Sequence, residues 1–391
     1  MLLRPPLYRR PLPCLARVAA IATLAWSAAC AAGPHEGDSR ATRAALGPSA
    51  HAAPVDTGGG AAPATAEAES AAVHAFFAAQ VADKRLTDAA FMVVLGDEMH
   101  VEKIAYPSAD DLTIPAYLFA PPDTTVRRPT VLFVHGGVHG DFGLSHLDQV
   151  RALVRRGYVV VAPEYRGSTG YGLSFYAMLD YGGREVDDVV AARGYLSRFV
   201  PYADLDRLAV MGYSHGGYIA LFAVLRHPEH FRAAVAHVPV ADLPTRMRTK
   251  PAWYEELFVA QPAFGAPLAE RPGPYVARSP SAHARALVRP VLVHAADNDA
   301  DVHIAENRVL RDSMRAAGKE ERGLYTYREW HDPPGGHSFG LLDTPEGRES
   351  WAETVAFLDR FVARPSRPSR SGERPAARAA AAGATRVGEP R

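Results

Sequence analysis

Cysteine is nearly absent from this chain. The 391-residue sequence has two, Cys14 and Cys30, and both lie within its first thirty residues, so a disulfide framework is excluded. Net charge is also absent: 43 basic residues balance 43 acidic ones. No overall field would therefore attract nucleic acid or another charged polymer, and no nucleic-acid partner is expected. Apolar residues are plentiful, at 48% of the chain, which is enough for a sizeable core.

The N-terminal region has no hydrophobic run long enough to cross a bilayer. Its apolar run, residues 18–26, is short, follows several arginines and precedes Ser27-Ala28-Ala29-Cys30. This pattern predicts a signal peptide over residues 1–30 and an exported, periplasmic or cell-surface protein. The segment resembles a lipoprotein cleavage site, at which Cys30 would carry a lipid and attach the protein to a membrane. Ser27 stands where leucine is usual, so ordinary signal cleavage is the alternative.

Two further segments have few large apolar side chains. Residues 31–70 are mostly Ala, Gly, Pro, Ser and Thr, and residues 364–391 are mostly Pro, Ser, Arg and Ala. Neither composition can bury enough apolar surface to offset the entropy of folding. The sequence predicts a disordered linker over 31–70 and a disordered basic tail over 364–391, which leaves 71–363 for a catalytic domain.

Hydrophobic periodicity within 71–363 predicts an α/β fold. Residues 71–86 have helical spacing, and 100–106 and 112–119 alternate like the strands of a hairpin. Later strands are predicted at 130–134, 158–162, 208–213, 233–238, 290–295 and 324–328, and helices at 146–156, 184–199, 218–225 and 348–361. Repeated strand–helix units indicate a doubly wound, mostly parallel sheet with helices on both faces. Residues 241–289 interrupt this rhythm and are interpreted as a lid.

The sequence Gly212-Tyr213-Ser214-His215-Gly216 joins a predicted strand to a predicted helix. In that context the G-x-S-x-G pattern indicates a nucleophile elbow, a sharp turn that presents a serine hydroxyl at the top of a sheet. Ser214 is therefore the candidate nucleophile. The alternative is a glycine-rich turn with an ordinary serine.

A nucleophilic serine needs a base, and the base needs a carboxylate to orient it. In doubly wound hydrolases the acid and then the histidine follow the serine along the chain, each after a later strand. Strand 290–295 is followed by three candidate acids: Asp297, Asp299 and Asp301.

The loop after strand 324–328 contains two histidines. His337 is the predicted base, because two glycines precede it and a terminal helix follows; His331 is the alternative. The aspartate run lacks the glycine and distal glutamate of a calcium loop, and His331, Asp332 and His337 lack the spacing of helical zinc ligands. No metal or cofactor is expected.

An oxyanion hole needs two hydrogen-bond donors. The backbone N–H of His215 is one candidate. The second is a backbone N–H in His135-Gly136-Gly137 or the hydroxyl of Tyr171.

Four segments, in this order, resemble the catalytic domain of the prolyl oligopeptidase family of serine peptidases, an α/β-hydrolase family. They are His-Gly-Gly at 135–137, Arg-Gly-Ser-Thr-Gly-Tyr-Gly at 166–172, Gly-Tyr-Ser-His-Gly-Gly-Tyr at 212–218, and Ser-Pro-Ser at 279–281 ahead of 290–294. The family's acid lies three residues before a valine, which implies Asp299, three before Val302. A family tyrosine gives its hydroxyl to the oxyanion, which implies Tyr171. The resemblance covers residues 98 to 363.

Two departures from the family bear on function. His294 is followed by Ala295 where the family usually has glycine, and too few residues precede the sheet for the family's β-propeller. We therefore expect an open site. The predicted activity is cleavage of short peptides through an acyl-enzyme, with Ser214, Asp299 and His337 as the triad. The alternative is a carboxylesterase acting on small acyl esters. A catalytically inactive surface-binding protein is a third hypothesis, which the ordered triad disfavours.

Overall fold

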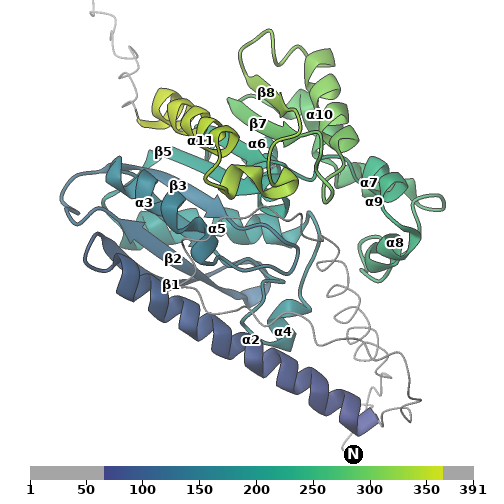
Figure 1. The fold of residues 1–391 in the computed structure, drawn as a ribbon, viewed down its shortest axis with the longest axis horizontal. Coiled ribbons are helices and arrows are strands. Elements are labelled where there is room, and N and C mark those ends of the chain that lie inside the picture. Colours follow the sequence, from purple (N-terminus) through teal and green to yellow (C-terminus); the bar gives the residue numbers. More distant parts are fainter. Residues whose placement is uncertain (1–65, 364–391) are drawn as a thin grey trace, which may run out of the picture.

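The computed structural model describes residues 66–363, which form an eight-stranded mixed sheet in the order β1-β2-β4-β3-β5-β6-β7-β8 (Figure 1). The strands are β1 (His100–Pro107), β2 (Thr113–Ala120), β3 (Arg128–Val134), β4 (Val159–Pro163), β5 (Ala203–Tyr213), β6 (Ala233–His237), β7 (Val291–Ala296) and β8 (Tyr325–Trp330). β2 pairs antiparallel with β1 and β4, and all other pairs are parallel. The predicted doubly wound sheet is confirmed. The predicted signal peptide, the basic tail and the linker up to residue 65 lie outside the described residues.

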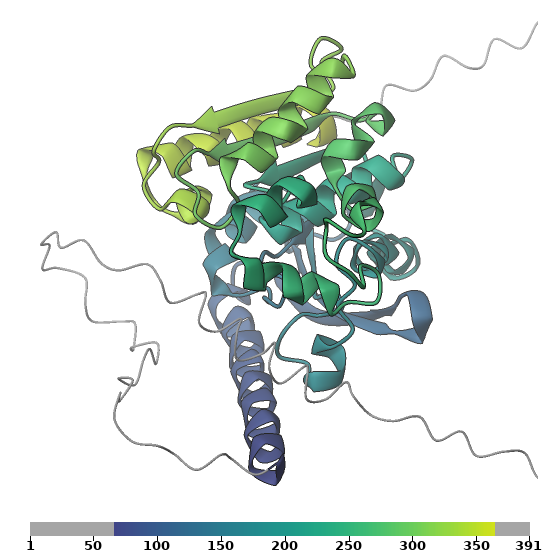
Figure 2. The ribbon, with the colours of Figure 1, turned by 90° about the vertical axis from the view of Figure 1, so that its right-hand side faces the viewer.

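Helices cover both faces of the sheet (Figures 1 and 2). They are α2 (Ala66–Leu95), α3 (Leu147–Arg155), α4 (Leu173–Tyr176), α5 (Arg184–Phe199), α6 (His215–Arg226), α7 (Leu243–Thr249), α8 (Ala252–Val259), α9 (Pro272–Ala277), α10 (Ile304–Ala316) and α11 (Pro345–Leu358). Short 3-10 turns connect several of them.

The packing of β3 explains why apolar residues occupy consecutive positions in its sequence. Leu132 and Val134 enter a core cluster with α5 and α6, whereas Val131 and Phe133 enter a second cluster with α3, α11 and the end of α2. Successive side chains of a strand point to opposite faces, and both faces of this sheet are covered, so both sets of positions must be apolar. The strand's end is thereby fixed in the middle of the sheet.

The N-terminal helix differs from its predicted bounds. α2 begins at Ala66, inside the predicted linker, and continues to Leu95 rather than residue 86. The extension is held by Phe91 and Leu95, which are fully buried in the cluster with α3. Figure 1 shows α2 as one long helix that runs past the edge of the sheet formed by β1 and β2. No helix within residues 66–363 is both long and apolar enough to span a bilayer.

The segment interpreted as a lid lies between β6 and β7 and contains α7, α8 and α9. Its first residues continue directly from the carboxyl end of β6. Among the helices that were not predicted, α10 follows the aspartate run and packs beside β7 and α7. Many of its residues are polar, but one face of the helix is buried and includes Leu310 and Met314.

Candidate active site

Ser214 occupies a strained backbone position between β5 and α6. Its φ of 55° and ψ of −118° lie in a region that non-glycine residues rarely adopt. The Ser214 N–H donates to the carbonyl of His237 on β6 at 2.8 Å, and its carbonyl accepts from Tyr218 of α6 at 3.0 Å. These two bonds hold the turn in place and confirm the elbow geometry.

The two glycines of the elbow are required by close approach. A Cβ on Gly216 would lie 2.3 Å from the Val134 carbonyl oxygen, and one on Gly212 would lie 2.4 Å from the Gly216 carbonyl. Both distances are far shorter than a van der Waals contact. The elbow therefore presses against the end of β3, which brings residues 135–137 alongside the serine.

Asp299 and His337 come together because their loops follow adjacent parallel strands, β7 and β8. Asp299 Oδ2 lies 2.7 Å from His337 Nδ1, and Asp299 Oδ1 accepts the N–H groups of Asp301 and Val302 at 2.8 Å each. The Asp299 side chain is 1% exposed. With one oxygen fixed by backbone donors, the other can orient only the imidazole. Nδ1–H then donates to Asp299, which leaves Nε2 free to accept a proton.

The alternative acid and base form a separate pair. Asp297 Oδ2 lies 2.5 Å from His331 Nδ1, and Asp297 also accepts the Asp332 N–H at 2.7 Å. The backbone N–H of Asp332 and then His331 hold the pKa of Asp297 below its usual range. The His331 side chain is 92% exposed. The second pair is therefore more exposed than the Asp299–His337 pair, and neither of its residues lines the Ser214 cavity.

Ser214 and His337 open into one cavity of about 320 Å³. The cavity is lined by Gly137, Val138, Tyr181, Ser214, His215, Val240, Arg246, Asp301 and His337. The structure thus brings together the predicted nucleophile and base. Tyr181, Arg246 and Val240 were not predicted, because no motif marks them; Arg246 belongs to the lid segment and Val240 directly precedes it.

The residues around Ser214 offer backbone donors for an oxyanion. Gly137 lines the cavity, and a Cβ on Gly136 would lie 3.4 Å from the Ser214 Cβ. The imidazole Nε2 of His215 lies 2.9 Å from Glu185 and is buried, so the group that His215 can offer from the first turn of α6 is its backbone N–H. Of the two predicted sources for the second donor, the His-Gly-Gly segment is the one beside the serine.

The predicted oxyanion role of Tyr171 needs correction. Its hydroxyl accepts from Lys103 Nζ at 2.8 Å, and Tyr171 is not among the residues that line the Ser214 cavity. Lys103 also pairs with Asp88 of α2 at 2.9 Å. The tyrosine is therefore part of the contact between α2 and the loop after β4. The motif predicted the correct loop, but it did not show that the Tyr171 hydroxyl would contact Lys103.

A buried ion pair ties α2 to that loop. Lys84, 3% exposed, forms an ion pair with the fully buried Glu164, contacts Asp141 Oδ2 at 2.7 Å and donates to the Phe142 carbonyl at 3.0 Å. Burial opposes the charged form of Lys84, and the carboxylates of Glu164 and Asp141 outweigh it, so its pKa is raised. Glu164 also lies 3.4 Å from His135 Nε2. The chain Lys84–Glu164–His135 connects α2 to the segment beside Ser214.

Arg166, in the segment 166–172 that resembles the family, has a structural role. Its Nε and Nη2 donate to the two oxygens of the buried Asp188 at 2.8 and 2.9 Å. This bidentate pair fixes the loop after β4 to α5. It explains why an arginine is needed there without any part in chemistry.

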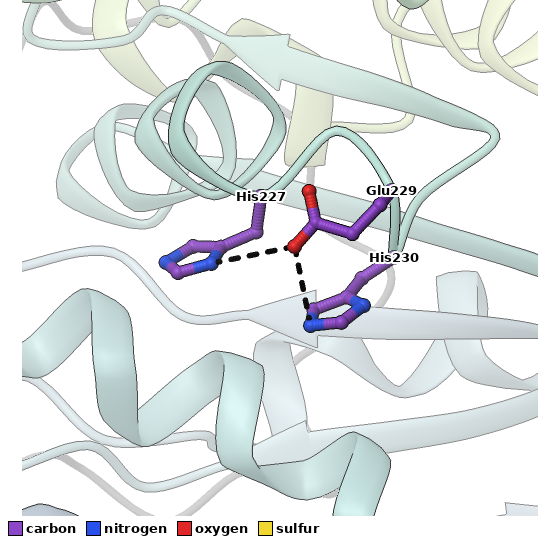
Figure 3. Close-up of side chains that lie close together, drawn as sticks. All are labelled: His227, Glu229 and His230. Atoms are coloured by element: carbon purple, nitrogen blue, oxygen red, sulfur yellow. Dashed lines mark ion pairs between the residues drawn. The ribbon is translucent and has the colours of Figure 1, made fainter.

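A group of possible metal ligands lies away from the cavity, at the end of α6. Figure 3 shows the Glu229 carboxylate between the imidazoles of His227 and His230, 3.9 and 3.4 Å from their nearest nitrogens. Glu229 is 61% exposed. Exposed acidic groups beside histidines are common without a bound ion, and we assign this group no function.

Comparison with known proteins identifies the family of the chain. Residues 145–363 match the model of the prolyl oligopeptidase family. Mouse dipeptidyl peptidase 8 is 35% identical over 155 residues, which are 37% of this chain and 17% of that protein. Dipeptidyl-peptidase 5 of Aspergillus fumigatus is 30% identical over 210 residues, 52% of this chain and 28% of that protein. The chain thus matches less than a third of either relative.

Solved structures give the same fold. Acylaminoacyl peptidase of Pyrococcus horikoshii superposes with a TM-score of 0.59 at 18% identity, over 71% of this chain and 44% of that one. A puromycin-hydrolysing peptidase of Mycobacterium tuberculosis gives 0.56 at 24% identity, over 68% and 39%. Since the family model covers more than half of the sequence, the chain belongs to the prolyl oligopeptidase family.

Proposed function

We propose that this protein is a serine peptidase that cleaves short peptides through an acyl-enzyme. The observation that carries the proposal is the Asp299–His337 hydrogen bond at the rim of a cavity that Ser214 and His337 share. The strained Ser214 backbone supports it, because strain of this kind persists where a side chain must be presented in one direction.

In the proposed first step, Ser214 Oγ bonds to the carbonyl carbon of the scissile peptide while its proton passes to His337 Nε2. The C–N bond then breaks and that proton goes to the departing amine. In the second step water adds to the acyl-enzyme and gives its proton to His337 Nε2, which passes it to Ser214 Oγ as the C–O bond breaks and the acid leaves. Asp299 keeps the imidazole in the required tautomer and balances its positive charge.

Two backbone N–H groups are proposed to donate hydrogen bonds to the developing oxyanion. The His215 N–H is one, and an N–H of the segment 136–137 is the other. Such donors act best when they are fixed before the reaction, and each is worth roughly 10²–10³ in rate. The close contact between the elbow and the end of β3 supplies that fixity. None of these steps uses a cofactor.

Peptide bonds are the proposed substrates because the relatives matched here are named as peptidases. The carboxylesterase alternative has no observation of its own in its favour. A cavity of about 320 Å³ suits a few residues of an extended peptide or a small acyl group. The test compares dipeptidyl amides with short acyl esters on the purified protein. Turnover of esters alone would contradict the proposal.

Labelling with a fluorophosphonate separates both enzymes from an inactive binding protein. A reactive Ser214 takes up the label, and Ser214→Ala abolishes it. His331→Ala is the matched control, because that histidine pairs with Asp297 outside the cavity. Unlabelled wild-type protein would favour the surface-binding hypothesis.

We also propose that the protein is exported, with Cys30 as a lipid attachment site. The support is the arginine-rich start, the short apolar run and the small residues before Cys30. Mass spectrometry of the mature N-terminus from a bacterial membrane fraction tests this. A diacylated Cys30 is expected, and an unmodified terminus near residue 31 would replace lipidation with ordinary cleavage.

A further inference from the structure

The cavity beside Ser214 contains polar groups that the triad does not use. Arg246 of α7 and Tyr181, which precedes α5, both line it. The Tyr181 side chain is 1% exposed, and its hydroxyl has no hydrogen-bond partner among the described residues. A buried hydroxyl without a partner is costly, and such groups in native proteins usually meet a ligand or water.

Arg246 is held rigidly by three neighbours. Its Nη1 donates to Glu306 at 2.9 Å and to the Asp301 carbonyl at 3.2 Å, and its Nε donates to the Tyr254 hydroxyl at 2.9 Å. Within the described part of the chain, Nη2 has no hydrogen-bond partner. The fixed guanidinium therefore keeps one donor group unused in a residue that lines the cavity.

The charges around this donor decide what it can bind. Glu306 is fully buried and neutralises Arg246. Asp301, a further acidic residue, also lines the cavity, and its backbone carbonyl accepts from Arg246. A second anion would compete with the buried Glu306 carboxylate for the one guanidinium, whereas a neutral group with a carbonyl oxygen would meet unused donors.

We propose that this cavity receives the side chain of the residue whose carbonyl Ser214 attacks, and that it selects a carboxamide, glutamine or asparagine. The carboxamide oxygen accepts from Tyr181 and Arg246 Nη2, and its NH2 group donates to the Asp301 carboxylate. An apolar side chain leaves all of these groups unpaired. This inference rests on the proposed peptidase function.

Kinetics on a substrate series tests it. Alanyl-Xaa amides of aminomethylcoumarin, with glutamine, glutamate, leucine or alanine as Xaa, are compared by kcat/KM. Glutamine is expected to exceed leucine by about tenfold or more, since one or two buried hydrogen bonds separate them. Glutamate is expected to fall below glutamine. Equal or faster cleavage of leucine overturns the selection, and faster cleavage of glutamate overturns the charge argument.

Two variants connect the preference to these residues. Tyr181→Phe removes the unpartnered hydroxyl and keeps the ring, and Arg246→Lys keeps the charge beside Glu306 but loses the planar donor fork. Each is expected to lower the glutamine-to-leucine ratio by roughly fivefold to tenfold. Tyr325→Phe is the matched control, because Tyr325 on β8 is also buried with an unpartnered hydroxyl and lies outside the cavity lining. Its ratio stays at the wild-type value.

The outcomes distinguish a failure of the carboxamide selection from a failure of the proposed peptidase function. If no amide in the series is cleaved, the peptidase proposal fails. If amides are cleaved but the ratio is unchanged in both Tyr181→Phe and Arg246→Lys, only the carboxamide selection fails. Circular dichroism on each variant confirms that the ratios are compared between folded proteins.

Discussion

Asp299 Oδ2 lies 2.7 Å from His337 Nδ1, while Asp297, two residues earlier, pairs with the exposed His331. Two Asp–His pairs thus sit on the same two loops, and only one faces the cavity. Asp299→Asn should lower kcat by roughly 10³–10⁴, because the amide favours the wrong imidazole tautomer. Asp297→Asn is the control and should retain kcat within about twofold. The assignment of the acid is wrong if Asp297→Asn loses activity and Asp299→Asn does not.

The corrected position of Tyr171 predicts that its hydroxyl is dispensable for chemistry. Tyr171→Phe removes a hydrogen bond to Lys103 and should lower stability by about 1 kcal/mol. Its kcat should stay within about twofold of wild type, since the loss is structural. Steady-state kinetics and urea denaturation measure the two effects. A hundredfold drop in kcat in the folded variant would restore the tyrosine to the oxyanion hole.

The Lys84–Glu164 pair predicts that α2 depends on one buried charge. Lys84→Met leaves the Glu164 carboxylate buried without its partner and should cost about 3–5 kcal/mol of unfolding free energy. Arg85→Met changes an exposed neighbour on the same helix and should cost within about 0.5 kcal/mol.

The double variant Lys84→Met/Glu164→Gln provides a second check on this pair. Removing both charges should recover part of the stability lost in Lys84→Met, because no charge is then left buried. Chemical denaturation of all three variants gives the comparison. No recovery would mean that packing of the lysine stem, rather than charge, holds α2.

The elbow predicts opposite effects for two glycine-to-alanine changes. Gly216→Ala places a methyl 2.3 Å from the Val134 carbonyl oxygen, so the elbow must move. We expect loss of several kcal/mol or of nearly all activity. Gly194→Ala, in α5, meets nothing within 4 Å and should stabilise the helix by roughly 0.5–1 kcal/mol. Thermal melting and labelling of Ser214 distinguish the two. An active, stable Gly216→Ala enzyme would disprove the close contact.

Buried histidines predict a loss of stability in mild acid. Burial lowers the pKa of His146 to about 4 from 6.5, so the native state resists a proton that the unfolded chain accepts. The stability from this group is complete above pH 6.5 and is lost as the pH falls toward 4. His146 stacks on Phe142 at 4.7 Å between ring centroids. His146→Phe should therefore show a shallower fall of the melting temperature over that interval.

Carboxylates also titrate between pH 4 and 6.5, so the difference between the two proteins is the informative quantity. This difference reports the titration of His146, because the carboxylates are the same in both proteins. Identical slopes for wild type and His146→Phe would show that this histidine does not bind its proton as burial requires.

The parallel strands and the elbow were predictable because local patterns fix them. A run such as Val159–Pro163 must be covered on both faces, and glycines that flank a serine permit a turn that larger residues would block. The ordered appearance of Ser214, the aspartate run and His337 followed from topology, since parallel strands end at one edge. A polar helix such as α10 gave a weak pattern, because only its inner face is apolar.

The order of the residues along the chain did not show which way each side chain points. Asp297, Asp299 and Asp301 all follow the same strand, and only the family's valine spacing favoured Asp299. In the structure, backbone donors from residues 301 and 302 and the approach of His337 select Asp299. Tyr171 lies in the expected loop, yet Lys103 and α2 draw its hydroxyl away from the serine. Arg246 of the lid segment and Tyr181, which precedes α5, carry no motif, and only tertiary packing brings both to the cavity. Local sequence determines which turns and strands form, because their sterics are local; the tertiary structure decides which side chains meet, because contacts between distant segments have no local pattern.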